Sequence, residues 1–418
     1  MNKIVVRGGR RLSGDVLIGG SKNAALPILF GGIGTAGQCV FANLPRVSDV
    51  LQTLEILKFL GARIRFLGSG EVRVDYSTVR YCTVPATLTG SIRGSNYLMG
   101  ALLARFGKAE LAAAGGCDFG SRPIDQHLLG FERLGAKISF RGDAVVVEAP
   151  NGLQGTEIAL AMPSVGATAN LMLAATASVG ETVIHNAAAE PHVMALATFL
   201  QDAGAQIFGI GTQTVRVIGN LPLHGTHHTV IPDMIEAGTY LALGMACGGP
   251  IRVRDIIPDH LGALLTAFGD MGGRVDVGEH TVTISAPNGY KGAEIVTGPY
   301  PAFPTDLHPQ MAAVLAAGVA EGEGRVRETV FKSRFGYVEE LCRMGAEATV
   351  EGDTVCLSPR PLKGCKLRSP DLRGGAALLI AALSATGQSE ITNAATIGRG
   401  YEHLEAKLRA LGAHISVY

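Results

Sequence analysis

The sequence predicts an α/β protein made of two globes, each built from three repeats of about 70 residues. Three observations predict this architecture: a recurring glycine, two alternating kinds of helix, and short strands of alternating polarity. The glycine ends a helix and leads into a strand, and it stands at Gly61, Gly135, Gly204, Gly272, Gly345 and Gly412. The intervals run from 67 residues (412−345) to 74 residues (135−61), so one unit of helix and strand recurs along the chain.

The first helix of each repeat is apolar nearly all round and rich in small residues. The six stretches are KNAALPILFGG, GSNYLMGALLARFG, GATANLMLAATASVG, EAGTYLALGMACGG, LHPQMAAVLAAGVAEG and GGAALLIAALSATG. Helices of this composition are buried, and Gly and Ala let them approach one another closely. We therefore expect these helices at the centre of each globe.

The second helix of each repeat is amphipathic. In VSDVLQTLEILKFLG the apolar residues Val50, Leu54, Leu57 and Leu60 fall on one face. The glycine that follows suits a left-handed C-terminal cap. The strands after it, such as ARIRFL and AKISF, alternate in polarity and should expose one face. The sheets are therefore expected outside the central helices.

The boundary between the globes is expected near residue 233, after the strand in HHTVIPD. One domain would comprise residues 22–232, and the other residues 1–21 together with 233–418. Residues 1–21 are expected to form a strand pair that completes the last repeat. A repeat cannot bury its apolar face alone, so three repeats are a reasonable minimum for each globe. Two chain crossings would then form a hinge.

Composition excludes several classes of protein. With 47% hydrophobic and 17% charged residues the chain is not disordered, and zero net charge without basic runs argues against nucleic-acid binding. Apolar runs such as 376–383 are far shorter than the roughly 20 residues of a membrane span, and the N-terminus lacks the apolar core of a signal peptide. Seven widely spaced cysteines without C-x-x-C favour a reducing cytoplasm and argue against zinc. We expect a cytoplasmic protein without a metal, cofactor or membrane partner.

Polar and charged residues occupy equivalent positions at the helix starts. The first helices begin at Lys22 and Asn23, Arg93, Ser164, Asp233 and Glu236, Asp306, and Arg373. The entries to the second helices carry Arg46, Arg122 and Pro123, Glu190 and Pro191, Pro258 and Asp259, Arg334, and Arg399. If the helices of each globe run parallel, their N-termini share one face. Two such faces would enclose a cleft suited to a multiply charged anion.

Helix capping is the competing explanation for these residues. Ser164, Asp306 and Asn23 are residue types that commonly cap helices. Arginine and lysine, in contrast, are disfavoured at helix N-termini by the helix dipole. The cations at these positions therefore indicate a bound anion; they are Lys22, Arg93, Arg122, Arg334, Arg373 and Arg399.

The loop AAAGGCDFGSRPID, residues 112–125, is the second informative feature. Cys117 stands in a segment too rich in glycine to be core, and a nearby Arg122 in an exposed loop would favour the reactive thiolate. The other six cysteines are expected to be small core or surface residues.

Two apparent motifs do not indicate a functional site. GIGTAG at 32–37 follows a helix and precedes a strand, the reverse of the order in a dinucleotide site, and is expected to be a loop. His227 and His228 lack further metal ligands.

Eight segments, in order along nearly the whole chain, carry a resemblance to a known family. They are SKNAALPI, ARFG, GGC-x-x-G-x-RP-x-D-x-H (115–127), PSVGAT (163–168), PDMIEAGTY (232–240), FPTDLHPQ (303–310), DLR (371–373) and RGYE (399–402). The chain resembles the UDP-N-acetylglucosamine 1-carboxyvinyltransferases, the enolpyruvyl transferases of peptidoglycan synthesis in the EPSP synthase family. The resemblance implies two inside-out α/β barrels with the active site in the cleft between them, which agrees with the repeats.

The resemblance also implies a reaction without a cofactor. The enolpyruvyl group of phosphoenolpyruvate would move to the 3′-hydroxyl of UDP-N-acetylglucosamine, with release of phosphate, by addition and elimination. This is the first committed step of peptidoglycan synthesis, which serves cell shape and division, and the step that fosfomycin inhibits. Cys117 would be the general acid, Asp306 the general base at the sugar hydroxyl, and Lys22 a third catalytic residue. The cysteine loop would close as a lid.

The remaining implied roles concern substrate binding. Lys22, Arg122 and Arg399 would hold the phosphate, with Arg373 and Arg334 nearby, and Asn23 and Arg93 would contact the sugar nucleotide. Arg122, Pro123, Asp125 and His127 would border the uracil, Ser164, Val165 and Gly166 would bind the diphosphate, and Val330 and Asp371 would complete the substrate-binding set.

The chain departs from the family pattern in two places. It has FKSRFGYV (331–338) where the family often has FENRFMHV, so Lys332 replaces Glu, and Gly336 and Tyr337 replace Met-His. Ser48 stands where some members have Lys, with Arg46 as its substitute.

Three alternatives stay open at this point. A 5-enolpyruvylshikimate 3-phosphate synthase shares the fold and donor, but the cysteine loop and RP-x-D-x-H argue against it. A divergent paralog of secondary metabolism would transfer enolpyruvyl to another uridine nucleotide. A UDP-sugar sensor would need neither Cys117 nor Asp306.

Overall fold

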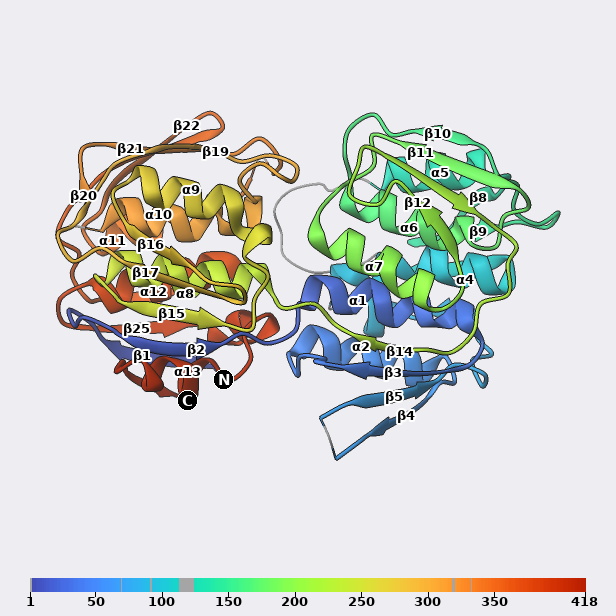
Figure 1. The fold of residues 1–418 in the computed structure, drawn as a ribbon, viewed down its shortest axis with the longest axis horizontal. Coiled ribbons are helices and arrows are strands. Elements are labelled where there is room, and N and C mark those ends of the chain that lie inside the picture. The colour runs from blue at the N-terminus through green and yellow to red at the C-terminus, as the bar shows by residue number, and fades with distance from the viewer. Residues whose placement is uncertain (1, 69, 91, 113–123, 318–319, 332) are drawn as a thin grey trace. The chain divides into compact units, whose positions relative to one another are not determined.

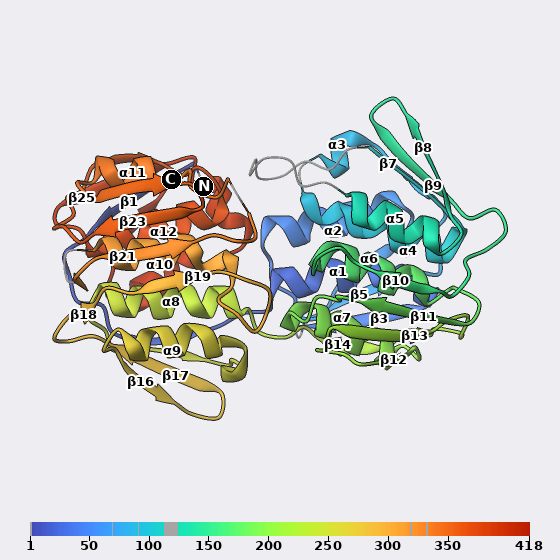
Figure 2. The same ribbon diagram turned by 90° about the horizontal axis from the view of Figure 1, so that it is seen from above.

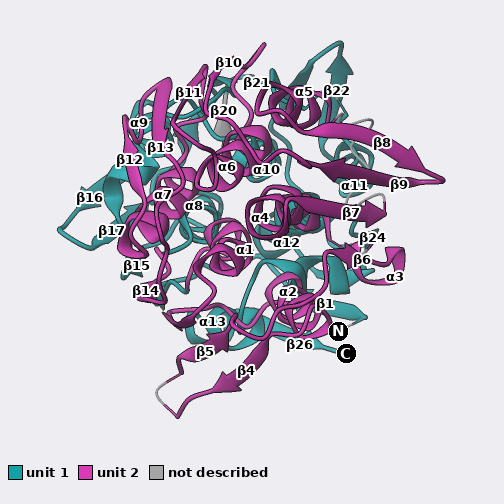
Figure 3. Ribbon diagram, turned by 90° about the vertical axis from the view of Figure 1, so that its right-hand side faces the viewer, with its two compact units in different colours: residues 1–19, 232–418 teal, residues 20–231 magenta. Residues whose placement is uncertain are grey.

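The chain forms two compact units, coloured separately in Figure 3. In the computed structural model the described residues are 2–68, 70–90, 92–112, 124–317, 320–331 and 333–418. Unit 1 comprises Met1–Gly19 and Pro232–Tyr418, and unit 2 comprises Gly20–Ile231. Each unit has its own hydrophobic core.

Unit 2 contains three successive repeats of helix and strand (Figure 1). The first has α1 (Lys22–Gly31), η1 (Gly32–Thr35), β3 (Gln38–Ala42), α2 (Ser48–Phe59), β4 (Arg63–Phe66) and β5 (Val72–Asp75). The second has β6 (Thr83–Val84), α3 (Ala86–Thr89), η2 (Arg93–Tyr97), α4 (Leu98–Phe106), β7 (Lys108–Ala112), α5 (Asp125–Arg133), β8 (Lys137–Arg141) and β9 (Ala144–Glu148). The third has β10 (Glu157–Ala159), α6 (Val165–Ala175), β11 (Glu181–His185), α7 (Pro191–Asp202), β12 (Gln206–Phe208) and β13 (Thr214–Ile218), and β14 (His227–Thr229) follows.

Unit 1 repeats the same order of elements. It begins with β1 (Lys3–Arg7) and β2 (Gly14–Leu17), and its first repeat has α8 (Met234–Ala246), β15 (Ile251–Arg254), η3 (Pro258–Leu261), α9 (Gly262–Asp270), β16 (Arg274–Val277) and β17 (Thr281–Ser285). The second has β18 (Tyr290–Lys291), β19 (Glu294–Val296), η4 (Thr305–Leu307), α10 (His308–Ala316), β20 (Ala320–Glu321), β21 (Gly324–Arg327), α11 (Val338–Arg343), β22 (Glu347–Glu351) and β23 (Thr354–Ser358). The third has β24 (Lys366–Arg368), α12 (Leu372–Ser384), β25 (Gln388–Thr392), η5 (Ala394–Arg399), α13 (Leu404–Ala410) and β26 (His414–Val417).

Every repeat contributes one four-stranded sheet with the same layout within the described residues. An edge strand runs parallel to its neighbour, and two antiparallel strands follow. The sheets of unit 2 are β14-β3-β5-β4, β6-β7-β9-β8 and β10-β11-β13-β12. The four-stranded sheets of unit 1 are β2-β15-β17-β16, β19-β21-β23-β22 and β24-β25-β1-β26, and β18 and β20 form a further two-stranded sheet. This repetition confirms the predicted architecture.

The N-terminal strands β1 and β2 pair only partly as the sequence predicts. β1 enters the last repeat between β25 and β26, where Val5 pairs with Glu390 on one side and Ser416 on the other. This part of the expectation is confirmed. β1 and β2 do not pair with each other, however, because β2 runs parallel to β15 with Val16 opposite Val253. The backbone of each N-terminal strand therefore satisfies its hydrogen bonds in a different sheet.

The burial pattern confirms that the first helices form the core and the sheets surround them. In unit 1, α8, α10 and α12 pack against one another inside the sheets (Figure 2). Leu241, Val314 and Ala377, one from each helix, are fully buried. The sheets are half exposed, as Phe66 and Phe140 show with 47% and 69% of their surface accessible.

The six recurring glycines all lie in the left-handed region. Their φ angles run from 88° at Gly412 to 106° at Gly61, a conformation that glycine adopts without steric cost. The expected C-terminal caps are thus confirmed. Of residues 32–37, expected to be a loop, Gly32–Thr35 instead continue α1 as the 3₁₀ helix η1, and only residues 36 and 37 form a loop before β3 begins.

Two further expectations concern membranes and cysteines. Within the described ranges, no helix combines the length and apolar composition needed to cross a membrane. The six described cysteines are all free thiols, with Cys39 buried and Cys342 exposed.

Candidate active site

In unit 1 the three central helices begin close together. Asp233 caps α8, Asp306 lies in η4 two residues before α10 begins, and Arg373 is the second residue of α12. Arg373 bonds to Asp306 and also interacts electrostatically with Asp233. The helix starts of this unit therefore share one face, as expected from the repeats.

Asp306 is held by two buried arginines. Arg334 Nη2 donates to Oδ1 at 2.8 Å, and Arg373 donates to Oδ2 from Nη2 at 3.1 Å and from Nε at 3.3 Å. The Asp306 side chain is 24% exposed, against 4% and 3% for Arg334 and Arg373. The N-cap of α10 is Leu307, so capping does not explain Asp306. The arrangement presents a partly accessible carboxylate in a fixed orientation beside two cations.

Arg373 is in turn held by Tyr401, from the RGYE segment. Its Nη1 donates to the Tyr401 hydroxyl at 3.3 Å, and its guanidinium lies 5.7 Å from the centre of that ring. The hydroxyl lies 2.9 Å from Thr239 Oγ1. Burial alone would lower the pKa of Arg373, but Asp306, Tyr401 and Asp233 together outweigh burial and the pKa rises. Arg373 is therefore a permanent cation.

Arg334 is linked through Thr305 to a buried carboxylate that the sequence analysis missed. Arg334 Nη1 donates to Thr305 Oγ1 at 2.9 Å, and that hydroxyl donates to Glu328 Oε2 at 2.8 Å. Glu328 is 1% exposed and also accepts from the amides of Val330 and Phe331. Burial alone would raise the pKa of Glu328, yet these hydrogen bonds and that from His308 lower it overall.

His308 connects Glu328 to Tyr337, in the segment FKSRFGYV. Its Nδ1 lies 2.9 Å from Glu328 Oε2, and its Nε2 lies 2.8 Å from the hydroxyl of Tyr337. Burial, aided by the charge of Arg334, lowers the pKa of His308 more than Glu328 raises it. The imidazole is thus neutral, donating from Nδ1 to Glu328 and accepting from Tyr337.

Three other predicted residues of unit 1 have different surroundings. Asp371 is the N-cap of α12, and its Oδ1 accepts from the amides of Arg373 and Gly374 at 2.8 and 3.0 Å. Val330 is 38% exposed, with its amide bound to Glu328. Arg399 ends η5 and is partly buried.

In unit 2, Lys22 is paired with a buried carboxylate. Lys22 is the first residue of α1, and its Nζ donates to Asp49 Oδ2 at 2.8 Å, with the side chains 12% and 5% exposed. Asn23 does not cap the helix, because Ser21 is the N-cap. Asp49 lies in the first turn of α2 and was missed; its position one turn after Arg46, at an equivalent helix entry, was the available signal.

The predicted nucleotide-binding residues of unit 2 lie at neighbouring helix starts. Ser164 caps α6, which Val165 and Gly166 begin, and its Oγ accepts from Ala167 N at 3.3 Å. Asp125 is the exposed first residue of α5, and His127, in the same turn, is 7% exposed. Burial, aided by the charge of Arg93, lowers the pKa of His127 to about 4. Arg93 begins η2.

Cys117, Arg122 and Pro123 lie outside the described residues, as does Lys332. Arg46, suggested as the substitute for a family lysine, lies over the ring of Phe66 at 5.6 Å.

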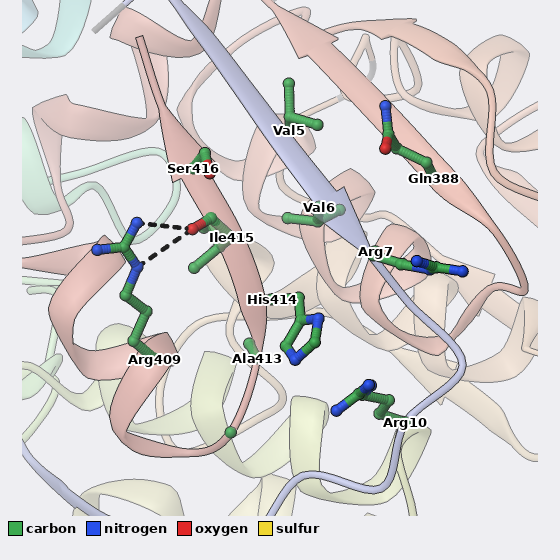
Figure 4. A pocket seen from close by; sticks show the side chains of 11 residues that line it. Val5, Val6, Arg7, Arg10, Gln388, Arg409, Ala413, His414, Ile415 and Ser416 are labelled. Atoms are coloured by element: carbon green, nitrogen blue, oxygen red, sulfur yellow. Dashed lines mark hydrogen bonds between the residues drawn. The ribbon is translucent and has the colours of Figure 1, made fainter.

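One hollow of the surface lies apart from these residues. A shallow groove of about 710 Å³ crosses β1 and β26 (Figure 4), with Arg7, Arg10 and His414 in its lining. Arg409 also lines it, and donates from Nε and Nη2 to Ile415 O at 3.1 and 3.0 Å. None of the predicted site residues lines this groove. Within the described part of the chain, no cluster of three or more His, Cys, Asp or Glu residues suits a metal ion.

Comparisons with known proteins find a family match over nearly the whole chain. The model of the family EPSP synthase (3-phosphoshikimate 1-carboxyvinyltransferase) matches residues 6–408. UDP-N-acetylglucosamine 1-carboxyvinyltransferase 2 of Carboxydothermus hydrogenoformans is 44% identical over 418 residues, covering 99% of each chain. UDP-N-acetylglucosamine 1-carboxyvinyltransferase 2 of Listeria monocytogenes is 41% identical over 416 residues, covering 99% of this chain and 97% of its own.

Solved structures show the same fold. The enolpyruvyl transferase NikO from Streptomyces tendae has a TM-score of 0.90 at 29% identity, covering 100% of this chain and 99% of its own. EPSP synthase from Acinetobacter baumannii has a TM-score of 0.75 at 18% identity and covers 100% of both chains, a likeness of fold alone. Since the family model spans nearly the whole sequence and relatives above 40% identity cover its full length, the chain belongs to the EPSP synthase family and is an enolpyruvyl (1-carboxyvinyl) transferase.

Proposed function

We propose that this enzyme transfers the enolpyruvyl group of phosphoenolpyruvate to the 3′-hydroxyl of UDP-N-acetylglucosamine and releases phosphate. The observation that carries the proposal is the Asp306 carboxylate, partly exposed and held by Arg334 and Arg373. The names of the relatives at 41–44% identity support the choice of acceptor. Use of the product in peptidoglycan synthesis, and a cytoplasmic location, are parts of the same proposal.

The addition step needs a base at the acceptor and an acid at the donor. Asp306 would take the proton of the 3′-hydroxyl while that oxygen bonds to C2 of phosphoenolpyruvate. Cys117, outside the described residues, would give a proton to the methylene carbon C3, so that the C2–C3 double bond becomes single. The product of this step is a tetrahedral intermediate that carries both phosphate and sugar on C2.

In the elimination step the Cys117 thiolate would take a proton from C3, and the double bond between C2 and C3 would form again as the bond from C2 to the phosphate oxygen breaks. The departing phosphate would take the proton that Asp306 removed from the sugar hydroxyl. Arg373, a cation held by Asp306 and Tyr401, would stabilise negative charge on the reacting groups together with Arg334. Lys22, fixed by Asp49, and Arg399 would bind the donor phosphate.

The nucleotide would occupy unit 2 at the start of α6. The amides of Val165 and Gly166 precede the first hydrogen bond of the helix, from Thr168 N to Ser164 O, and are therefore available to a diphosphate. Asn23, Arg93, Asp125 and His127 would contact the sugar nucleotide, together with Arg122 and Pro123.

The test is phosphate release on mixing the enzyme with both substrates, with the product mass measured. Release that requires both phosphoenolpyruvate and UDP-N-acetylglucosamine, with a product mass equal to the enolpyruvyl adduct, is expected. Parallel reactions with UMP and with shikimate 3-phosphate test the other acceptors. Turnover of either of these in preference to UDP-N-acetylglucosamine would contradict the proposal.

A further inference from the structure

Asn170 and His127 form a buried polar network within unit 2. Asn170 lies in the middle of α6 and is fully buried. Its Oδ1 accepts from Gly100 N at 2.8 Å. Its Nδ2 donates to the carbonyl oxygen of Asn96 at 3.0 Å and lies 2.9 Å from His127 Nδ1. Three helical segments, η2 with α4, α5 and α6, are thus joined by one amide.

The network fixes which way the Asn170 amide points. A backbone N–H needs an acceptor, so the atom that faces Gly100 is the amide oxygen. The carbonyl of Asn96 needs a donor, so the atom that faces it is the amide nitrogen. One hydrogen of that nitrogen remains for His127, and Nδ1 of His127 must therefore accept it.

The same reasoning fixes the tautomer of His127. A ring nitrogen that accepts a hydrogen bond carries no proton, so the neutral imidazole has its proton on Nε2. Two charged groups act on this ring: Arg93 disfavours its protonation, and Asp125 favours it more weakly. Burial is the dominant effect and keeps the ring neutral, with a pKa of about 4.

His127 Nε2 lies against the start of α6. A Cβ placed on Gly166 would come within 2.9 Å of both Nε2 and Cε1, which explains why this position has no side chain. His127 is 7% exposed, and Nε2 has no hydrogen-bond partner among the described residues. The Nε2–H group and the amides of Val165 and Gly166 are therefore neighbouring hydrogen-bond donors that can bind an acceptor from a ligand.

We propose that Asn170 is a positioning residue that holds His127 in the Nε2–H tautomer, and that this N–H donates to a diphosphate oxygen of the bound uridine nucleotide. The inference rests on the proposed function, because it takes its ligand from there. It adds an uncharged donor to the helix start and assigns a role to a residue that contacts no substrate. Since the donor is neutral, it recognises the ligand by geometry and adds no further positive charge.

Two substitutions of His127 separate this role from simple packing. The amide of His127→Gln reaches the position of Nε2 and keeps a donor toward the ligand. The amide of His127→Asn reaches the position of Nδ1 and keeps only the contact with Asn170. UDP binding, measured by titration calorimetry without phosphoenolpyruvate, should stay within about threefold of wild type for His127→Gln and weaken about tenfold or more for His127→Asn. Equal losses, or the reverse order, would overturn the inference.

The contribution of Asn170 is tested through the ring itself. ¹⁵N-histidine NMR of the free enzyme should show protonated Nε2 in His127, with the signal assigned by its loss in His127→Gln. Asn170→Ala should produce a mixture of tautomers and weaken UDP binding. In the His127→Gln background, Asn170→Ala should have much less effect on binding, because it acts through the imidazole. Protonated Nδ1 in the wild type, or an undiminished effect in the double variant, would overturn the inference.

Further experiments test whether His127 contacts the diphosphate, and distinguish failure of this inference from failure of the proposed function. The penalty of His127→Asn should be present for UDP and nearly absent for uridine, and an equal penalty for both would overturn the phosphate contact. Failure of the wild type to bind UDP would contradict the proposed function as well as the inference. Normal UDP binding without a difference between the His127 variants would contradict the inference alone.

Discussion

The hydroxyl of Tyr337 lies 2.8 Å from Nε2 of His308, and the two rings meet edge to face with centroids 5.7 Å apart. Tyr337 belongs to the segment that departs from the family pattern. Through His308, Glu328 and Thr305 it is linked to Arg334, which binds Asp306. Tyr337 therefore belongs to the hydrogen-bond network that holds Arg334 beside Asp306 in unit 1.

Tyr337→Phe should destabilise the protein. The substitution leaves Nε2 of the buried His308 without its donor, which costs about 1–3 kcal/mol in free energy of unfolding. Urea unfolding measures the loss, and Tyr81→Phe, at a 59% exposed tyrosine, is the control. A stability equal to that of the control variant would show that the hydrogen bond contributes nothing.

Asp306→Asn should lower kcat by about 10²–10⁴-fold, the range typical of a lost general base. The fold should persist, because the amide keeps the size of the carboxylate and still has an oxygen to accept from Arg334 or Arg373. Phosphate release measures the effect, and Asp259→Asn, at an exposed acid of η3, is the matched control. A kcat within a factor of a few of wild type would remove Asp306 from the role of base.

Asp49→Asn should weaken the binding of phosphoenolpyruvate by about tenfold, because Lys22 loses the carboxylate that fixes its ammonium group. The KM for the donor measures this effect, with UDP affinity expected to be unchanged. Glu55→Gln, on the same helix and 56% exposed, is the control. If the donor KM of Asp49→Asn matched that of Glu55→Gln, Asp49 would have no part in holding Lys22 for the donor.

The stability contributed by neutral His127 should depend on pH. Its pKa in the folded protein, about 4, lies below the ordinary value of 6.5, so the unfolded chain binds the proton more readily. This contribution is therefore fully present above pH 6.5 and is lost as the pH falls toward 4. The difference in unfolding free energy between wild type and His127→Gln, measured from pH 7 to pH 4, should change in favour of the variant as the pH falls. A pH-independent difference would contradict the shift.

Cys117→Ser should abolish alkylation by fosfomycin and weaken product formation, since the serine hydroxyl is a far poorer nucleophile and acid. Intact mass spectrometry should show a single adduct on wild type and none on the variant. Cys342→Ser, at an exposed free cysteine, should be alkylated like wild type. Persistent alkylation of Cys117→Ser would place the reactive thiol elsewhere.

Features set by local sequence could be predicted. The six glycines could be identified because each must adopt a left-handed backbone conformation at a helix end. Burial of α8, α10 and α12 followed from their uniformly apolar composition. The clustering of Asp306, Arg334 and Arg373 followed from equivalent positions in successive repeats, because equivalent helix starts meet on one face.

Features set by contacts between residues distant in the sequence could not be predicted. Asp49, Glu328 and Asn170 look like ordinary polar residues in the sequence, and their roles come from partners at Lys22, Thr305 and His127. The pairing of β2 with β15 could not be predicted either, since strand propensity does not specify a partner.

The position of β1 has a consequence for folding during synthesis. β1 is made before unit 2, yet both of its neighbouring strands, β25 and β26, are made after unit 2. Unit 2 is continuous in sequence, so its residues can fold while the ribosome is still translating unit 1. Throughout that time β1 has exposed backbone hydrogen-bonding groups on both edges, where other chains can pair with it. The last sheet of unit 1 is therefore completed only after translation reaches β26.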